Sequence, residues 1–359
     1  MRSFSYPGPV HNSTPDRIVF GPGSFDTLRD EVRRLDRRHA LIVSTPGRRE
    51  LAERAAEILG DHCVGILDEA ISQVPIELAV RGRARADESG ADCLVSVGGG
   101  ASIGLGKGIA LGHPLPIVAV PTTYSGSEMT GFCGITDGGI KRMHASTDML
   151  ATTVLYDASL TLSLPVSTTA SSAFNALAHC VDGPPVPTLS PLLAHNAIEG
   201  LQTILASLPA VLEAPDDLEA RNELLYGSYL AGAVLSGGFA VQHAIAHVLG
   251  GTFGIEHGLA HAVILPHVTR HLEQRGTLQA VQAAVGTSDL GGVLFELLRD
   301  VGLPTRLSEL GLTGGDLERA EAIASGHDAD TNEDLDQQDA RAVGQILRAA
   351  YAGHAPSTA

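Results

Sequence analysis

The chain is 359 residues long and carries 24 Lys and Arg against 41 Asp and Glu, for a formal net charge of −17. This acidic balance disfavours nucleic acids and anionic membranes as partners, because both require a basic surface. Hydrophobic residues make up 44% of the chain and charged residues 18%. That composition is typical of a globular protein, and the length leaves room for two domains.

Several classes of protein are disfavoured by what the chain lacks. No run of about 18 apolar residues is free of polar breaks, so we expect no transmembrane helix. The N-terminus has no apolar stretch of the kind found in secretory signals. The four cysteines are scattered without a CxxC pair: Cys63, Cys93, Cys133 and Cys180. We expect buried thiols in a reducing cytoplasm, and neither a disulfide framework nor a zinc knuckle.

Residues 1–160 alternate short apolar runs with helical patterns. Six runs that end in Gly, Pro, Ser, Thr or Asp are expected to be strands, at 17–21, 40–44, 62–68, 92–100, 116–123 and 152–157. Helical patterns lie between several of them, at 24–35, 48–59 and 76–89. This alternation predicts an α/β domain with a mostly parallel sheet covered by helices.

The strand patterns stop after Leu160–Pro165. The rest is rich in Ala and Leu at helical spacing, for example at 168–181, 191–207, 217–235, 241–249 and 336–352. We therefore expect an all-helical domain over 161–359, with the boundary near residue 160. The acidic stretch 328–336 is expected to be a solvated loop.

Three consecutive glycines, Gly98, Gly99 and Gly100, end an apolar strand directly before a helical pattern. Glycine lets the backbone approach a phosphate, and the start of the helix offers free N–H groups and the positive end of its dipole. We expect a Cβ at the middle glycine to push the backbone off the bound phosphates and to force a disallowed φ. The motif is neither GxGxxG, because Ile103 takes the third glycine's place, nor a Walker A sequence. A tight turn without a ligand is the alternative.

A second polar loop, PTTYSGSEMT at 121–130, also follows an apolar strand. It offers four hydroxyl groups, on Thr122, Thr123, Ser125 and Ser127. Each alone is typical of a turn or a helix cap. Polar loops at the carboxyl ends of parallel strands are, however, where such sheets bind nucleotides. The two loops together predict that residues 1–160 bind a dinucleotide.

The strand at 40–44 bears on which dinucleotide is bound. Thr45 follows it, in place of the acidic residue that would hydrogen-bond a ribose 2′-OH and repel a 2′-phosphate. Arg48 and Arg49 come next, either to pair with that phosphate or as solvated residues at a helix start. We place Thr45 at the cofactor and expect weak discrimination between NADH and NADPH.

Five histidines of the second half fall on helical faces: His179, His243, His247, His257 and His261. A helix places His243 and His247 on one face because they are four residues apart, and Asn175 precedes His179 by the same spacing. Imidazoles from separate helices are what a Zn²⁺ or Fe²⁺ site needs. A lone histidine on an apolar helix is usually a core residue, as we expect for His195 and His267.

These features together resemble the iron-containing alcohol dehydrogenase superfamily, whose fold is shared with dehydroquinate synthase. The N-terminal half has the family's motifs in the family's order: the glycine loop, the PTT loop, Lys141, VLYD and LP. The C-terminal half does so as well, with NALAH, HAIAH with VLGG, and HG with a later LP. The maleylacetate reductase branch is the most similar, on PTTYSGSEMT, GIKR, TVLYD with LTLSLP, and NALAH. The resemblance covers nearly the whole chain. It implies an NAD(P)-binding domain, a helical catalytic domain, a cleft between them and a homodimer.

The resemblance also assigns residues. The glycines and Ser102 would meet the pyrophosphate, and Lys141 a ribose. The remaining cofactor residues, on the phosphate, ribose and nicotinamide side, would be Thr122, Thr123 and Ser127. The family's metal ligands, one Asp and three His, fall on Asn175, His179, His243 and His257. His247 matches a histidine that family members use for proton handling.

Asn175 bears most on mechanism, because an amide brings no negative charge to a metal. In the maleylacetate reductase branch this position is typically Asn, and metal is typically not required. The resemblance thus implies a reductase that adds hydride to a C=C bond conjugated to a carbonyl. His243 or His257 would stabilise the enolate oxygen, and His247 would protonate the α-carbon.

Other functions stay open at this point. Three neutral histidines can still hold zinc, so a metal-dependent alcohol dehydrogenase or carbonyl reductase is one alternative. A non-redox lyase or cyclase on the same scaffold, and a binding protein without turnover, are others. Two cationic residues usual in the maleylacetate reductase branch are also missing, at Ala244 and at Thr152–Thr153. A different enone or carbonyl substrate is therefore an alternative to maleylacetate.

Overall fold

The computed structural model describes residues 15–138, 140–325 and 335–356. They form two compact units. The α/β unit comprises the described part of Ser13–Leu164 with Pro215–Leu225, and the helical unit comprises Pro165–Ala214 with the described part of Tyr226–Ala359. Residues 1–14, which bear on the expectation about the N-terminus, and most of the acidic stretch 328–336 lie outside the described residues. Among those described, no helix is both long and apolar enough to span a bilayer.

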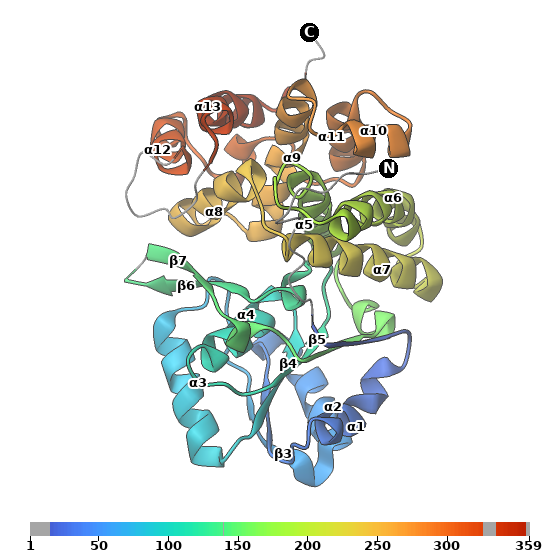
Figure 1. Ribbon diagram of the computed structural model, residues 1–359, viewed down its shortest axis with the longest axis vertical. Helices are drawn as coiled ribbons and strands as arrows, with labels where there is room; N and C mark the ends of the chain where they lie inside the picture. The colour runs from blue at the N-terminus through green and yellow to red at the C-terminus, as the bar shows by residue number, and fades with distance from the viewer. Residues whose placement is uncertain (1–14, 139, 326–334, 357–359) are drawn as a thin grey trace, which may run out of the picture. The chain divides into compact units, whose positions relative to one another are not determined.

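A six-stranded parallel sheet forms the centre of the α/β unit (Figure 1). Its strand order is β1-β8-β5-β4-β2-β3. The strands are β1 (Arg17–Phe20), β2 (Ala40–Val43), β3 (Cys63–Leu67), β4 (Cys93–Gly98), β5 (Ile117–Pro121) and β8 (Thr153–Tyr156). They are the six expected from the sequence, and the expected α/β fold is confirmed. Gly98 pairs in register with Pro121, so β4 and β5 end side by side.

Helices cover both faces of this sheet (Figure 1). On one face α1 (Leu28–Arg34) and α2 (Arg49–Leu59) bury their apolar sides against the strands. On the other face lie α3 (Ile76–Ser89) and α4 (Gly100–Ala110). Every residue of α4 from Ser102 onward is buried, as expected of a helix that is apolar on all sides. The residues at its start are thereby fixed at the end of β4.

A two-stranded antiparallel hairpin was not expected from the sequence. It comprises β6 (Phe132–Asp137) and β7 (Ile140–Ala145). Burial alternates along the first part of β6, which is the period of a strand with one covered face. The DGG sequence at 137–139 is a turn signal that a search for hairpins would have found.

The helical unit is built from nine helices in the described residues. They are α5 (Val166–Asp182), α6 (Pro191–Glu213), α7 (Leu218–Leu235), α8 (Val241–Phe253), α9 (His257–Gln274), α10 (Gln279–Val285), α11 (Leu290–Asp300), α12 (Gly314–Ala324) and α13 (Gln337–Ala352). The first residues of α7, up to Leu225, belong to the α/β unit. Helix α5 is buried from Thr169 to its end and contacts α6, α8 and α9. The expected helical C-terminal part is confirmed.

The four cysteines are free. Cys93, Cys133 and Cys180 are buried as expected, whereas Cys63 at the edge strand β3 is only half-buried.

A buried histidine in α9 should make the protein less stable in acid. Burial, with a smaller effect from His354, lowers the pKa of His267 to about 4. The unfolded chain takes up this proton near pH 6.5, so the native state loses about 1.4 kcal/mol per pH unit as the pH falls from about 6.5 to 4. Urea unfolding at several pH values measures the slope. His267→Gln should flatten it. His195, which we expected in the core, is exposed, so His195→Gln should leave the slope unchanged. Equal slopes in all three proteins would contradict the assignment.

Candidate functional site

The glycine loop joins β4 to α4 and leaves the start of that helix open. Gly98 has φ +141°, and a Cβ there would lie 2.3 Å from Ser102 Oγ. Gly99 is the N-cap of α4, and no side chain caps the helix. The first N–H groups of α4 are therefore not taken by a cap, which is the arrangement that binds phosphate groups.

The expectation about the φ of the middle glycine was wrong. Gly99 has φ −86°, which any residue adopts, and the unusual conformation belongs to Gly98. Gly99 is needed for another reason, because a Cβ there would lie 2.8 Å from Thr123 Cγ2. Close approach of the two loops, and not backbone strain, excludes a side chain at this position.

The loop after β5 lies beside the glycine loop. Thr122 N donates a hydrogen bond to the Gly98 carbonyl oxygen at 3.1 Å. Thr122 and Ser102 are fully buried, and neither hydroxyl has a hydrogen-bond partner among the described residues. Buried polar groups nearly always have a partner. Two such hydroxyls beside an uncapped helix fit a polar ligand at this edge of the sheet.

Ser127, expected at the nicotinamide side, lies further along the same loop. It begins a short 3-10 turn, Ser127–Met129. Its carbonyl oxygen accepts a hydrogen bond from Lys107 Nζ at 2.5 Å. Sequence reasoning used Lys107 only to exclude a Walker A motif and missed its contact with this loop.

Thr45 follows β2, the neighbour of β4 in the sheet. The two arginines after it already have partners within the α/β unit. Arg48 Nη1 donates to Ser163 Oγ at 2.7 Å. Arg49 forms ion pairs with Glu53 and with Asp68, each at 2.9 Å. These contacts weaken the case for either arginine as a partner of a 2′-phosphate.

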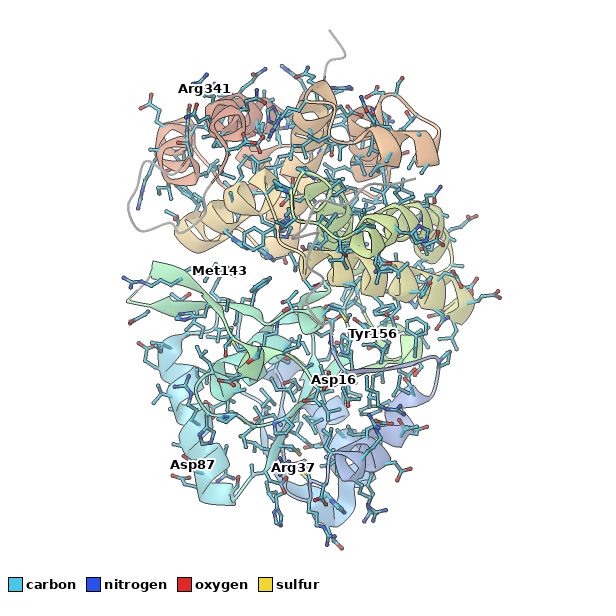
Figure 2. The ribbon with its side chains drawn as sticks, viewed as in Figure 1. Asp16, Arg37, Asp87, Met143, Tyr156 and Arg341 are labelled. Carbon is cyan, nitrogen blue, oxygen red and sulfur yellow. The ribbon has the colours of Figure 1, made fainter. Side chains whose placement is uncertain are left out.

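Lys141 lies on the hairpin and not on either loop. It pairs in register with Thr136, and a Cβ at Gly134 would meet its Cε atom. The hairpin in turn contacts α4, where Cys133 Sγ donates to the Gly104 carbonyl oxygen at 3.5 Å. Met143 marks the same strand in Figure 2.

All five expected histidines come together in the helical unit. His179 stacks on His243 with ring centroids 5.0 Å apart, and His261 lies 4.6 Å from both His243 and His257. His247 lies 5.9 Å from His243 and from His257. The rings come from α5, α8 and α9. The sequence spacing thus predicted a real cluster.

A glycine allows α9 to begin against α5. A Cβ at Gly258 would lie 2.9 Å from the Ser171 carbonyl oxygen, so a side chain there would force the helices apart. Glu256 caps this start of α9 by accepting from Gly258 N and Leu259 N. This close approach brings the start of α9, which carries His257 and His261, against α5.

Two rings of the cluster are held neutral. Burial, reinforced by neighbouring histidines, lowers the pKa of His179 and of His261 well below the ordinary value. Neutral imidazoles each offer one N–H donor and one acceptor nitrogen. At pH 7 His179 and His261 are therefore neutral donors.

Asp182, which sequence reasoning missed, organises one side of the cluster. Its Oδ2 lies 2.7 Å from His243 Nδ1 and accepts from Ala240 N, while Oδ1 accepts from Gln242 N at 3.0 Å. A neutral His243 therefore donates from Nδ1 to Asp182 and presents Nε2 as an acceptor. Nε2 is buried without a partner among the described residues. The signal in the sequence was the spacing His179–Asp182, which places both on one face of α5.

The donor set was tested for its fit to a metal. In the described part of the chain, no group of three or more His, Cys, Asp or Glu side chains is arranged to hold one. The rings of His179 and His243 lie 5.0 Å apart, with an angle of 22° between their planes. Asn175 brings a neutral amide, whose buried Oδ1 has no partner among the described residues. The set therefore lacks the carboxylate of the family's Asp-and-three-His site.

Comparison with known proteins places the chain in a family. Two family models match it, "Iron-containing alcohol dehydrogenase" over residues 15–158 and "Fe-containing alcohol dehydrogenase family, C-terminal" over residues 169–351. The chain belongs to the iron-containing alcohol dehydrogenase family. The resemblance stated from the sequence is confirmed, and this member of the family is an oxidoreductase.

Maleylacetate reductases are among its relatives. The chain is 40% identical to the one from Burkholderia cepacia over 344 residues, which cover 95% of this chain and 97% of that protein. It is 37% identical to the one from Pseudomonas sp. strain P51 over 352 residues, covering 97% and 99%. The crystal structure of maleylacetate reductase from Rhizobium sp. strain MTP-10005 superimposes with a TM-score of 0.89 at 36% identity, covering 97% of this chain and 99% of that one.

A side chain at Gly99 should disrupt dinucleotide binding by this family member. Gly99→Val places carbon atoms where Thr123 lies, so the two loops must separate. We expect the Kd for NADH, measured by the cofactor's fluorescence, to rise at least about tenfold with circular dichroism unchanged. Gly315→Val, at an exposed site in α12, is the matched control. Unchanged affinity in the Gly99 variant would show that the loop does not hold the cofactor.

Proposed function

We propose that this protein is an NAD(P)H-dependent reductase of the maleylacetate reductase type. The substrate would be an enone, a C=C bond conjugated to a carbonyl, with reduction of maleylacetate to 3-oxoadipate as the first candidate. The observation that carries the proposal is the cluster of five histidine rings from α5, α8 and α9, with Asn175 one turn before His179 on α5. Identity of 36–40% to maleylacetate reductases over nearly the full chain supports it.

The glycine loop and the loop after β5 would hold the cofactor. The uncapped start of α4 suits the pyrophosphate, and the buried hydroxyls of Ser102 and Thr122 have no hydrogen-bond partner among the described residues. When bound, a reduced nicotinamide supplies a hydride to the β-carbon of the conjugated bond. We propose Ser127, Thr45 and Lys141 as further contacts of the same cofactor.

The histidines would act on the substrate. Adding hydride at the β-carbon pushes negative charge onto the carbonyl oxygen, and N–H donors fixed in place stabilise that charge. His257 is one candidate donor. His243 can donate from Nε2 only as an imidazolium, with the carboxylate of Asp182 compensating its charge. His247 would protonate the α-carbon, which completes the reduction.

We propose that this reaction needs no metal. A carboxylate ligand would bring negative charge to a divalent cation, and Asn175 does not. Asp182 contacts the Nδ1 side of His243 and accepts from N–H groups at the start of α8. A cytoplasmic homodimer is part of the same proposal. The four free cysteines support the compartment, and light scattering tests the assembly.

A reductase assay tests the function. We expect oxidation of NADH or NADPH with maleylacetate, or with another enone from a panel that includes aldehydes, in the presence of EDTA. Because Thr45 leaves the 2′ position without an acidic residue, catalytic efficiency with the two cofactors should differ by less than about a hundredfold. Turnover of aldehydes alone would favour a carbonyl reductase. Substrate consumption without cofactor oxidation would favour a non-redox paralogue.

His247→Ala should lower kcat by roughly 10²–10⁴, the usual contribution of a positioned acid, with little change in the Kd for NADH. His243→Ala should cost roughly 3 kcal/mol of transition-state stabilisation. His195→Ala, at an exposed site, is the control for both.

Metal analysis of the purified enzyme should find little iron or zinc, and Asn175→Asp should raise the affinity for either ion. Stoichiometric metal in the wild type, with activity lost to a chelator and restored by Zn²⁺ or Fe²⁺, would contradict the metal-free mechanism. That result would favour a metal-dependent alcohol dehydrogenase.

A further inference from the structure

We propose that Lys107 is a positioning residue for the cofactor, because its buried ammonium group fixes the segment from Ser127 to Phe132. The inference rests on the proposed function, in that Ser127 is taken to face the nicotinamide side. Lys107 would not touch the cofactor. It would act through the backbone of the loop that does.

The ammonium group makes its three closest contacts with acceptors of this one segment, and Ser127 Oγ lies further off at 3.5 Å. Nζ donates to the carbonyl oxygen of Ser127 at 2.5 Å, to Thr130 Oγ1 at 3.0 Å and to the carbonyl oxygen of Phe132 at 2.9 Å. An ammonium group has three N–H donors, so its donors are all used. Lys107 is 1% exposed, so water does not compete for them.

The first half of the loop is held by other residues. Tyr124 donates from its hydroxyl group to Thr161 Oγ1 at 3.0 Å and accepts from Arg221 Nη1 at 3.2 Å. All three side chains are fully buried. Loss of the Lys107 contacts would therefore free the segment from Ser127 onward and leave the start of the loop in place.

The charged and titratable groups around Lys107 come from three elements. Glu128, in the same loop, is 1% exposed and accepts from the hydroxyl group of Tyr156 at 2.6 Å; Tyr156 lies at the end of β8 (Figure 2). Cys133 on β6 is the other neighbour, and it also interacts with Lys141 on β7. Glu128 supplies a nearby negative charge, which reduces the cost of burying a cation.

The composition of the chain gives a second reason to assign this role to a lysine. Arginine makes up 22 of the 24 basic residues, and Lys107 and Lys141 are the only two lysines. A planar guanidinium group cannot replace a tetrahedral ammonium group whose three acceptors surround one point. A chain that otherwise uses arginine has lysine where this geometry requires it.

The same geometry makes cofactor affinity depend on pH. Burial lowers the pKa of Lys107 to about 8. The neutral amine has only two donors, so above pH 8 one of the three acceptors loses its partner. This loss of affinity is distinct from unfolding. A lysine of the unfolded chain keeps its proton to about pH 10.4, which is above the pKa of Lys107 in the native state. Deprotonation of Lys107 alone therefore does not destabilise the native state relative to the unfolded chain.

Two measurements test the proposal. The first is the Kd of the full-length protein for NADH by cofactor fluorescence, which is not obscured because the chain contains no tryptophan. We expect Lys107→Met to raise this Kd at least about tenfold, and Lys107→Arg not to restore it. Arg83→Met is the matched control, since Arg83 also donates to backbone carbonyls of α4, at Gly108 and Ile109, but not to the loop.

The second measurement uses the wild type, so it can be made even if Lys107→Met does not fold. Labelling with ¹³Cε-lysine gives two signals, which Lys141→Arg assigns. We expect the Lys107 signal to titrate near pH 8, and the Kd for NADH to rise with the same midpoint while circular dichroism stays constant. An unchanged Kd in Lys107→Met, or a pH-independent Kd in the wild type, would overturn the inference. Failure of the wild type to bind NADH or NADPH at all would instead overturn the proposed function.

Discussion

The histidine cluster depends on the hydrogen bonds that the carboxylate of Asp182 accepts. It is fully buried at the end of α5, and its two oxygens accept N–H groups from the start of α8 and meet His243 Nδ1. A buried carboxylate is costly unless its hydrogen bonds are all made. The start of α8 therefore cannot move away from α5 without exposing the carboxylate or leaving it buried without its hydrogen bonds. This fixes where His243 and, one turn later, His247 lie.

The orientation of His243 follows from the same contact and limits the chemistry of the site. Since Nδ1 is engaged by Asp182, only Nε2 remains for a substrate, and its role depends on the charge of the ring. His261 is held in a different way, with Gln242 donating to its carbonyl oxygen at 3.2 Å and lying 3.1 Å from its Nδ1. Adjacent rings thus have different second partners, and the imidazoles of the cluster are not interchangeable.

Part of the fold and part of the histidine cluster could be predicted from the sequence, because they follow from local patterns. The six strands of the sheet are short β-branched runs, and the i, i+4 spacing of His243 and His247 places both rings on one face. The Gly98 conformation could not be located, since three glycines in a row offer three places for the unusual φ and the local sequence does not distinguish them. The hairpin was missed because β7 carries Lys141, Arg142 and His144, which hide its strand pattern.

Asp182 and Lys107 escaped sequence reasoning for a shared physical reason. A search for functional residues looks for groups that would touch a ligand, and neither of these does. Each is a buried charged group that forms hydrogen bonds mainly with the backbone. Asp182 accepts from the amides that begin α8, and Lys107 donates to the carbonyl oxygens of Ser127 and Phe132. A charge satisfied in this way costs little only while that backbone keeps its conformation. Such residues therefore fix the segments that carry the binding groups, and their partners lie 20 to 61 positions away in the chain, beyond the reach of any local pattern.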